Sequence, residues 1–409
     1  MVREFIITIY LFVFKLVFDF FNLFPLKNKV TFVVSFGDNS KYVYEEIRKL
    51  DKDITVVVLY KGTSNLHFRD YPDIKLIPFE TLHIIDILRS IYHLATSNHI
   101  FVDNYFGFLA VTDFKKDVEC IQLWHASGAI KKFGLEDRSV QFRSSRAQQR
   151  FLKVYEKFNK VVVGSDHMAN TFINSFHLRK ENILRTGVPR TDFYYNKELH
   201  AKIKNQFVNA YPELINKKKI LYAPTYRDHQ LDRFDLKLDL ENMQNELGKD
   251  YVVLLRLHPA VKNSVNYAET YPGFVYDFSS AQHDINELLV IADYLITDYS
   301  SIPYEYSLLN KPMIFFAYDL ESYQKERGLG DKYERMVPGP IVKQTTDLIQ
   351  IIKENQFDYN QIRIYAKKWN KYSTGQSSQR LVQYLFQHDS VAMEVKRQTK
   401  TKTSSVSAL

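Results

Sequence analysis

The sequence predicts an α/β protein with two doubly wound, Rossmann-like domains that face each other across a cleft. Short β-rich segments alternate with polar or helical segments along most of the chain, which is typical of parallel sheets with crossover helices. The chain has 409 residues, too many for one compact core and enough for two domains of ordinary size. Its residues are 45% hydrophobic and 25% charged, as in globular proteins, so most of the chain is expected to fold.

The composition narrows the choice of partner and compartment. A formal net charge of +8 favours an anionic partner, and nucleic acid, lipid headgroups and phosphorylated substrates all satisfy that condition. The aromatic content, with 30 Phe and 28 Tyr, often accompanies proteins of membrane interfaces. The single cysteine, Cys120, excludes an internal disulfide and indicates a reducing compartment.

Residues 1–26 are expected to form an amphipathic membrane-anchor helix. The segment is strongly apolar and lacks the cleavage site of a secretory signal. At roughly 100° per residue its polar side chains fall on one narrow stripe: Glu4, Thr8, Lys15, Asp19 and Asn22. A spanning helix would place Lys15 and Asp19 in hydrocarbon at about 2.5–3.5 kcal/mol each. We therefore favour a helix in the interface plane with this stripe in water; a helix packed on the protein and a true span are the alternatives.

Residues 27–195 are expected to form the first domain and residues 196–388 the second, which closes with helices. Seven segments read as strands of the first domain: Val30–Ser35, Ile54–Leu59, Ile74–Ile77, Ile100–Val102, Cys120–Trp124, Val161–Gly164 and Ile183–Thr186. Five read as strands of the second: Ile220–Ala223, Tyr251–Leu257, Phe274–Tyr276, Tyr294–Thr297 and Met313–Phe316. Residues 389–409 are basic and poor in large apolar side chains, so a disordered tail is expected.

A basic helix is predicted from Gln141 to Asn159. Its cations recur every three or four residues and so share one face: Arg143, Arg146, Arg150, Lys153 and Lys157. Basic amphipathic helices often lie on anionic membranes, and this one follows a candidate active-site turn. We expect its basic face to contact the membrane and a lipid diphosphate; an ordinary solvated charged face is the alternative.

Five of the predicted strands end in polar turns, and in an open parallel sheet ligands bind outside the carboxyl ends of the strands. The turns are Trp124-His-Ala-Ser-Gly128, Thr186-Gly-Val-Pro-Arg190, Ala223-Pro-Thr-Tyr-Arg227, Arg256-Leu-His-Pro259 and Asp298-Tyr-Ser-Ser301. Chain reversal alone would favour Asn, Asp and Gly at such positions. Histidines, arginines and hydroxyls are prominent instead, which indicates an anionic, phosphate-bearing ligand.

Individual side chains of these turns could act as a base, as hydrogen-bond donors or as cations toward a phosphate-bearing ligand. His125 follows an apolar strand and precedes small residues, where a histidine can act as general base near neutral pH. His258 could donate a hydrogen bond to a phosphate or stabilise leaving-group charge. Three arginines could neutralise a pyrophosphate: Arg190, Arg227 and Arg256.

The turn of Asp298, Tyr299, Ser300 and Ser301 leads directly into a helix with Pro303 in its first turn. Main-chain N–H groups, two hydroxyls and the positive end of a helix dipole would together bind a phosphate. The alternative is that Ser301 merely caps the helix.

Several common site motifs are missing from the sequence. No G-x-G-x-x-G follows a strand, neither G-x-x-x-x-G-K-[ST] nor G-x-S-x-G occurs, and no His/Cys cluster has zinc spacing. The D-x-D motif at Asp51 to Asp53 precedes a strand, on the wrong side for a metal–nucleotide site. Metal-dependent and serine-hydrolase chemistry are therefore poorly supported, and no metal or cofactor is expected.

At these turns the sequence resembles the CDP-glycerol:glycerophosphotransferase family of wall teichoic acid synthesis, from about residue 95 to 385. The motifs are Leu123-Trp-His-Ala-Ser-Gly-Ala-Ile-Lys-Lys-Phe-Gly134, Gly187-Val-Pro-Arg190, Leu221-Tyr-Ala-Pro-Thr-Tyr-Arg227, Leu257-His-Pro259, Thr297-Asp-Tyr-Ser-Ser301 and Arg327-Gly-Leu329. The resemblance implies a GT-B fold whose second domain holds most of the nucleotide. It also implies a peripheral enzyme on the cytoplasmic face of the cell membrane that transfers glycerol phosphate from CDP-glycerol and releases CMP.

The resemblance also implies a donor site at the same turns. The implied residues are Trp124, Ala126, Ser127, Gly128, Arg190, Pro224, Thr225, Arg256, Leu257, Ser300, Ser301 and Glu305, to which the turns themselves add Arg227 and Asp298. His125 then resembles the base that deprotonates the acceptor hydroxyl, and His258 a partner of the pyrophosphate. Polymerising members tend to have Asp at the position of Glu305. Both are carboxylates, so Glu305 could still contact a donor hydroxyl, but from a longer side chain.

The Trp-His-Ala-Ser-Gly-Ala form and the modest length are most similar to the primase branch of the family. Primases add the first glycerol phosphate to the undecaprenyl-diphosphate-linked ManNAc-GlcNAc disaccharide, and polymerases often have an extra N-terminal region. The expected reaction is in-line attack of a lipid-linked sugar hydroxyl on the β-phosphate of CDP-glycerol. The alternatives are a transferase that adds later glycerol or ribitol phosphates, a sugar-nucleotide glycosyltransferase, and a non-catalytic nucleotide-binding membrane adaptor. A nucleic-acid partner is not expected.

Overall fold

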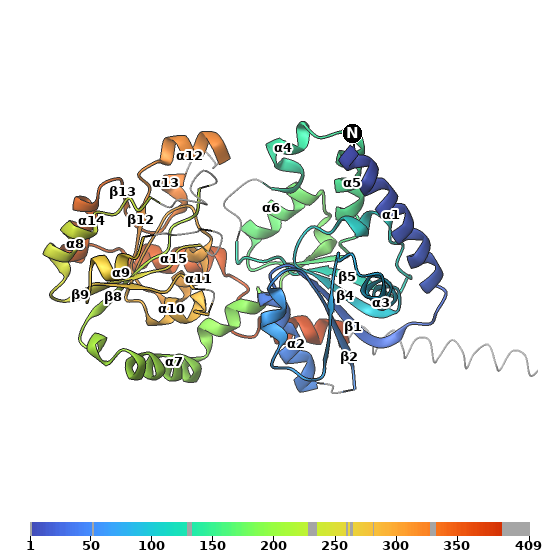
Figure 1. The fold of residues 1–409 in the computed structure, drawn as a ribbon, viewed down its shortest axis with the longest axis horizontal. Helices are drawn as coiled ribbons and strands as arrows, with labels where there is room; N and C mark the ends of the chain where they lie inside the picture. The colour runs from blue at the N-terminus through green and yellow to red at the C-terminus, as the bar shows by residue number, and fades with distance from the viewer. Residues whose placement is uncertain are drawn as a thin grey trace, which may run out of the picture. The chain divides into compact units, whose positions relative to one another are not determined.

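The structure is a computed structural model that describes residues 2–50, 53–128, 133–227, 235–258, 261, 265–280, 282–327 and 333–386. The chain forms two compact units. Unit 1 contains Met1–His125, Gly134–Asp192 and the chain from Tyr372 onward, whereas unit 2 contains Ala126–Phe133 and Phe193–Lys371. Each unit is built on one parallel sheet, as the alternation of segments predicted (Figure 1).

Unit 1 contains a seven-stranded parallel sheet with the order β3-β2-β1-β4-β5-β6-β7. Its strands are β1 (Lys27–Val34), β2 (Thr55–Tyr60), β3 (Ile74–Pro78), β4 (Ser97–Val102), β5 (Glu119–Gln122), β6 (Lys160–Val162) and β7 (Ile183–Leu184). All seven strands predicted for the first domain are therefore confirmed. Because β1 pairs with β4 and β4 with β5, the turns that follow these three strands lie at one edge of the sheet.

The sheet of unit 1 is buried on both faces, as a parallel sheet with crossover helices requires. Its longer helices are α2 (Asp38–Leu50), α3 (Ile84–Ala95), α5 (Ser145–Tyr155) and α6 (Asp166–Phe176). In the core, Phe32 of β1 stacks on Phe101 of β4 with ring centroids 4.8 Å apart. Val43 and Ile47 of α2 are fully buried in the same cluster, so the apolar face of α2 is held against the sheet.

The chain returns to unit 1 near its C-terminal end. Residues 377–386 form a helix whose Leu381, Val382 and Leu385 are buried in the core of unit 1. The expected second domain of residues 196–388 is therefore corrected: the division falls at Asp192, and the described residues from 372 onward belong to unit 1. The apolar pattern identifies this helix but does not reveal which sheet it covers. The predicted basic tail, residues 389–409, lies outside the described residues.

Unit 2 contains a six-stranded parallel sheet with the order β10-β9-β8-β11-β12-β13. Its strands are β8 (Lys218–Tyr222), β9 (Tyr251–Leu255), β10 (Val275–Asp277), β11 (Tyr294–Thr297), β12 (Met313–Phe316) and β13 (Ile341–Val342). The five strands predicted for this domain are confirmed. β13 was not predicted, because two residues after a Gly-Pro pair are too short to show any alternation.

Helices cover the sheet of unit 2 as crossover connections. They include α7 (Lys197–Ala210), α8 (Leu240–Leu247), α10 (Ile285–Ile291), α11 (Ile302–Tyr306), α14 (Thr345–Glu354) and α15 (Tyr359–Trp369). α8 and α14 lie side by side (Figure 1). Met243 of α8 and Leu348 of α14 are fully buried in the core of unit 2. α15 packs on α11 through Trp369 and Tyr304, whose ring centroids are 4.6 Å apart, and this contact supports the turn that precedes α11.

Helix α1 (Val2–Phe21) lies along unit 1 and has a buried apolar face and an exposed apolar face. On the buried face, Phe14 stacks on Phe108 and Phe18 meets the edge of Phe114, with centroids 5.4 Å and 5.6 Å apart. The exposed face consists of Phe5, Ile6, Ile9, Phe12, Val13, Leu16 and Phe20. Within the described ranges, no helix combines the length and the apolar character needed to cross a membrane.

The polar stripe of α1 is bound to unit 1. Arg150 donates to the Glu4 carboxylate at 3.1 Å, Lys15 lies 3.7 Å from Asp113, and Asn22 Nδ2 donates to the Asp113 carbonyl at 3.1 Å. The prediction that this stripe lies in water is therefore confirmed only in part: Thr8 and Asp19 are exposed, whereas Glu4, Lys15 and Asn22 hold the helix on the protein. The expected alternative of a packed helix describes the inner face, and membrane contact of the outer face remains a prediction.

The basic helix predicted over Gln141–Asn159 is present as the shorter α5 (Ser145–Tyr155), and only Gln141 belongs to the preceding α4 (Arg138–Gln141). α5 begins after Ser144, whose side chain caps it by accepting from a main-chain N–H. Three of the predicted cations are exposed: Arg143, Arg146 and Lys153. The other two, Arg150 and Lys157, form ion pairs that support α1 and the segment beside it. The basic face is thus shared between solvent and the attachment of α1.

Candidate active site

His125 lies in unit 1 at the end of the turn that follows β5. Trp124 adopts a left-handed backbone conformation with φ 60°, and its N–H donates to the Gln122 side chain at 2.9 Å. This bend brings the His125 ring into stacking contact with Phe36 and with Trp124, at centroid distances of 4.2 Å and 4.3 Å. The two aromatic contacts restrict the orientation of the imidazole.

The hydrogen bond of His125 fixes its tautomer. Nδ1 lies 3.0 Å from the main-chain carbonyl oxygen of Asp103. Because a carbonyl can only accept, Nδ1 carries the proton in the neutral ring and Nε2 retains the lone pair. Burial lowers the pKa of His125 because it disfavours the imidazolium, and the Arg190 charge acts in the same direction. His125 therefore has the properties of a neutral base.

Arg190 lies in unit 1 beside the same turn. Its main-chain N–H donates to the Asn39 side chain at 3.0 Å, and its Nη1 donates to the His125 carbonyl at 3.2 Å. The preceding Gly187 has φ +89°, and a Cβ there would lie 2.5 Å from the Tyr372 carbonyl oxygen. Only glycine allows this close approach, and the turn then carries Arg190 to the His125 main chain.

Sequence reasoning missed the turn between β1 and α2, which contacts His125. Asn39 Nδ2 donates to the carbonyls of Leu123 and Trp124 at 3.1 Å and 2.9 Å. Asp38 lies 3.7 Å from Arg190 Nη1. This segment also follows the carboxyl end of a strand, but Gly37, Asp38 and Asn39 are residue types favoured by chain reversal alone, so its composition did not distinguish it from an ordinary turn.

In unit 2, Asp298 joins the turns that follow β8 and β11. Its Oδ1 accepts the N–H groups of Thr225 and Tyr299 at 2.8 Å and 2.7 Å. Arg227 donates to Asp298 Oδ2 at 3.0 Å and forms a two-pronged ion pair with Asp319 at 2.8 Å and 3.0 Å. The Arg227 guanidinium is thus engaged within the protein and supports these turns, and the donor contact expected for Arg227 and Asp298 stays a prediction.

Pro224 and Thr225 lie at the carboxyl end of β8. The Thr225 Oγ1 is buried and has no hydrogen-bond partner among the described residues. A buried hydroxyl normally has a partner. Its position at a strand end where ligands bind is therefore consistent with the predicted ligand contact of Thr225.

Ser300 and Ser301 lie at the start of α11 in unit 2. The Ser300 hydroxyl accepts the N–H of Ile302 at 3.2 Å, whereas Ser301 makes no side-chain capping bond. Ser301 therefore holds the N-cap position, as that alternative expected, but its side chain forms no capping bond, and the side-chain contact at the helix start comes from Ser300. The Ser301 side chain is only half-buried.

The second half of the Trp124–Gly128 turn packs in unit 2. Ser127 Oγ donates to Glu305 Oε1 at 2.9 Å, and both side chains are buried. A Cβ on Gly128 would lie 2.4 Å from the Tyr304 ring, so this position requires glycine. The structure thus brings together three predicted donor residues, Ser127, Gly128 and Glu305. The chain passes from unit 1 to unit 2 between His125 and Ala126.

The turn after β9 carries Arg256, Leu257 and His258. Arg256 Nη1 donates to the carbonyls of Phe278 and Ser280 at 2.8 Å and 2.7 Å, which holds the turn after β10. The Leu257 side chain is buried, and the His258 ring packs on Tyr226 with centroids 4.6 Å apart. The turns after β8 and β9 are therefore in contact. Pro259 and the motif residues 129–132 and 328–329 lie outside the described residues.

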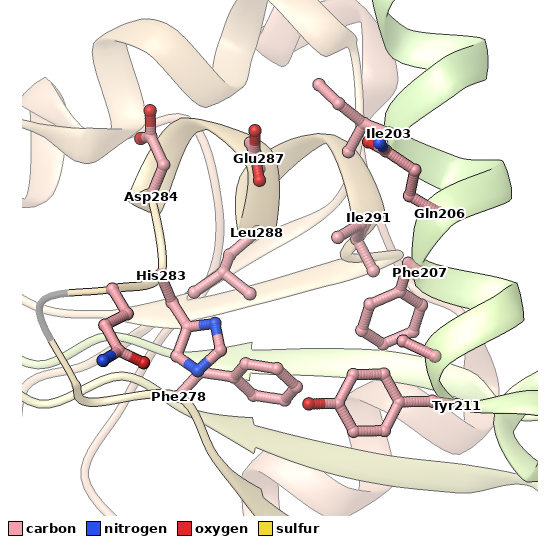
Figure 2. A pocket seen from close by; sticks show the side chains of 12 residues that line it. Ile203, Gln206, Phe207, Tyr211, Phe278, His283, Asp284, Glu287, Leu288 and Ile291 are labelled. Atoms are coloured by element: carbon pink, nitrogen blue, oxygen red, sulfur yellow. The ribbon is translucent and has the colours of Figure 1, made fainter. Parts of the chain in front are cut away.

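A groove of about 240 Å³ lies between α7 and α10 in unit 2 (Figure 2). Phe207, Tyr211 and Phe278 form its aromatic wall, and Asp284 and Glu287 belong to α10 or its N-terminal cap. None of the predicted donor residues lines this groove, so it is separate from the site described above. Over the described ranges, no group of three His, Cys, Asp or Glu side chains is arranged to hold a metal ion.

Comparison with known proteins agrees with the motifs and with the fold. The family model of CDP-Glycerol:Poly(glycerophosphate) glycerophosphotransferase matches residues 17–387. The chain is 36% identical to the teichoic acid glycerol-phosphate primase of Bacillus subtilis (strain 168) over 94% of this chain and 98% of that protein. It is 33% identical to the teichoic acid ribitol-phosphate primase of Bacillus spizizenii, covering 89% of this chain and 92% of that protein.

The fold is similar to that of the wall teichoic acid polymerase TagF. The match has a TM-score of 0.78 at 24% sequence identity and covers 96% of this chain and 99% of that chain. The parallel α/β architecture is therefore GT-B-like, as the resemblance implied, and the enzyme class follows from the family match across most of the chain. The chain belongs to the CDP-glycerol:poly(glycerophosphate) glycerophosphotransferase family of teichoic acid synthesis.

Proposed function

We propose that this enzyme is a teichoic acid primase, which transfers glycerol phosphate from CDP-glycerol to the ManNAc hydroxyl of undecaprenyl-diphosphate-linked ManNAc-GlcNAc and releases CMP. The observation that carries the mechanism is the state of His125, whose Nδ1 faces a carbonyl while Nε2 retains its lone pair. The match to a primase over almost its whole length supports the choice of branch.

In the proposed reaction, His125 Nε2 takes the proton of the acceptor hydroxyl while the hydroxyl oxygen attacks the β-phosphorus of CDP-glycerol. A new phosphorus–oxygen bond forms to the sugar, and the bond between the β-phosphorus and the bridging oxygen breaks. CMP leaves with the electron pair of that bond. Holding the nucleophile and the base in one orientation lowers the barrier by removing the entropic cost of their encounter.

We further propose that unit 2 binds the donor at the carboxyl ends of β8, β9 and β11. The Thr225 hydroxyl, the Ser300–Ser301 turn and His258 would donate hydrogen bonds to the diphosphate. Glu305 and Ser127 would contact or orient the glycerol moiety, since their hydrogen bond joins the Trp124–Gly128 turn to α11. Arg227 and Asp298 would act indirectly by holding these turns, and Arg190 would act through the main chain of His125. The proposed reaction contains no step that uses a metal ion.

We also propose that the enzyme acts peripherally on the cytoplasmic face of the cell membrane. The outer face of α1 exposes aromatic and aliphatic side chains, and α3 adds Leu82, Ile84, Ile85 and Leu88 at or near its start. α1 and α3 are in contact, with the rings of Phe21 and Tyr92 5.5 Å apart. Exposed apolar side chains on two helices in contact suit the boundary between lipid headgroups and acyl chains. The exposed cations Arg143, Arg146 and Lys153 would favour anionic lipids.

The proposed reaction is tested by CMP release from CDP-glycerol with a synthetic lipid-disaccharide acceptor. We expect His125→Ala to lose on the order of a hundredfold or more in kcat, because a general base contributes about 10²–10⁴-fold. His177→Asn is the matched control, since His177 is exposed and asparagine tolerates its left-handed conformation. Wild-type turnover by His125→Ala would remove His125 from the chemistry.

A second candidate is an enzyme of the same family that uses CDP-ribitol or adds further units. The 33% identity to a ribitol-phosphate primase favours testing this donor. We expect the product of the disaccharide-lipid acceptor and excess CDP-glycerol to be heavier than the acceptor by one glycerol phosphate, as measured by mass spectrometry. Several added units would indicate an extending enzyme, and transfer from CDP-ribitol alone would indicate the ribitol branch. Binding without any product would indicate a nucleotide-binding adaptor.

A further inference from the structure

Asp103 follows directly after β4 and contacts both His125 and the turn after β1. Its carboxylate accepts the N–H groups of Ser35, Phe36 and Gly37, each at 2.9 Å. Its main-chain carbonyl faces Nδ1 of His125. One residue therefore contacts both the turn after β1 and the imidazole.

The Ser35–Gly37 turn is held in a single conformation. Gly37 has φ +97°, and a Cβ there would lie 2.9 Å from the His67 ring, so the turn requires glycine. Asn39 then ties the start of α2 to the carbonyls of Leu123 and Trp124. The turn is thus attached to the His125 segment on one side and to Asp103 on the other.

Within this turn, Phe36 stacks on His125, and its side chain lies outside the hydrophobic core. Its side chain is 43% exposed, and its ring lies nearly parallel to the imidazole at an interplanar angle of 17°. An exposed phenylalanine contributes little to core packing. A buried carboxylate is also a costly way to hold a turn that asparagine or serine could hold. The arrangement is better explained by its effect on the imidazole.

We propose that Asp103 is a positioning residue for His125, acting through the Phe36 ring on one side and through its own carbonyl at Nδ1 on the other. The carboxylate fixes the turn, the turn places Phe36 against the imidazole, and the carbonyl selects the tautomer that leaves Nε2 basic. This inference rests on the proposed role of His125 as base and adds the device that orients it. Burial raises the pKa of Asp103 to about 6, against the effect of the three N–H groups, so the carboxylate is ionised at neutral pH.

The test compares Asp103→Asn, Phe36→Ala and the double variant. An asparagine side chain has one oxygen to accept with, so part of the N–H cluster loses its partner. We expect each single variant to lose on the order of tenfold to a hundredfold in kcat, as for a misoriented catalytic group, with the affinity for CDP-glycerol unchanged. The double variant should lose no more than the more affected single variant, because both changes act on the same contact. Phe36→Tyr keeps the ring and should retain most of the wild-type kcat.

Two controls separate positioning from a general loss of structure. Asp73→Asn removes another carboxylate of unit 1, which accepts from Tyr44 at 2.6 Å and pairs with Arg48, and it should leave kcat unchanged. Nuclear magnetic resonance of isotope-labelled histidine reports the tautomer of His125, and we expect the share with a protonated Nδ1 to fall in Asp103→Asn and in Phe36→Ala.

The proposal would be overturned by additive losses in the double variant, or by an unchanged His125 tautomer together with weakened CDP-glycerol binding. The tautomer is measured without turnover. If the tautomer shifts as expected but no glycerol phosphate is transferred by the wild-type enzyme, the positioning device stands and the proposed function fails.

Discussion

A histidine serves as a base at neutral pH only when the ring is kept neutral and one nitrogen keeps its lone pair. In this enzyme burial disfavours the imidazolium of His125, and the Asp103 carbonyl assigns the proton to Nδ1. The neighbouring Trp124 stacks on the ring, but the carbonyl that assigns the proton and the stacked ring of Phe36 both come from distant parts of the sequence. At this scale, function depends on contacts between segments that are distant along the chain.

The pH dependence of turnover follows from these contacts. The folded-state pKa of His125 is lowered, so its neutral form prevails at and above the usual pKa of about 6.5. We expect kcat/KM to fall on the acid side with a midpoint below pH 6.5, because protonation removes the Nε2 lone pair. The pKa of Asp103, about 6, places a second group on the same limb. A midpoint above pH 6.5 in the measured profile would contradict the neutral-base assignment.

At the scale of elements, the polar turns of unit 2 depend on a buried network of charges. Arg227 is 5% exposed and binds Asp298 and Asp319, and Tyr299 donates to Asp319 at 3.0 Å. These contacts join the segments that follow β8, β11 and β12. The network fixes the relative positions of the turns that are proposed to bind the donor.

Removing Arg227 should therefore destabilise unit 2. We expect Arg227→Ala to lower the free energy of unfolding by about 3–5 kcal/mol, because two carboxylates would be left without their cation. Urea denaturation measures the change. Arg185→Ala is the matched control: its ion pair with Asp166 is exposed, with side chains 42% and 44% accessible, and should contribute at most about 1 kcal/mol. Equal losses in both variants would show that burial of the network has no special effect.

Helix α1 supports the second prediction at this scale. We expect the double variant Phe12→Ser and Leu16→Ser to bind anionic vesicles at least roughly tenfold more weakly, because each apolar side chain contributes about 1.5–3 kcal/mol when fully removed from water. Vesicle cosedimentation measures the binding. Ile215→Ser with Ile364→Ser is the control, because both side chains are 58% exposed and belong to unit 2, whereas α1 belongs to unit 1. Equal binding by both double variants would exclude the outer face of α1 as the membrane contact.

At the scale of the whole molecule, the chain builds two parallel sheets and changes unit within one motif. His125 belongs to unit 1, and the next residue, Ala126, belongs to unit 2. The motif Trp124–Gly128 therefore contributes its base to one unit and its Ser127–Glu305 hydrogen bond to the other. Within unit 2 the close approach of the Tyr304 ring requires glycine at position 128.

Much of this organisation could be predicted from the sequence. Strands buried on both faces give continuous apolar segments, and twelve of the thirteen described strands were recognised in this way. The polar residues after them identified the candidate site, because strand ends at one edge of a parallel sheet gather ligand-binding groups. The same motifs indicated the family, which the match over residues 17–387 confirms.

The sequence by itself thus determined the fold class, the family and the turns of the candidate site, because local apolar patterns and motif spacing are properties of consecutive residues. Only the tertiary structure decided which partners within the protein the polar side chains have. Arg227 and Asp298 are joined in a buried network, the polar stripe of α1 is bound to Arg150 and Asp113, and the last described helix returns to unit 1. A charge or an apolar face shows that a side chain needs a partner, but the partner is chosen by packing between distant segments, which no local pattern records.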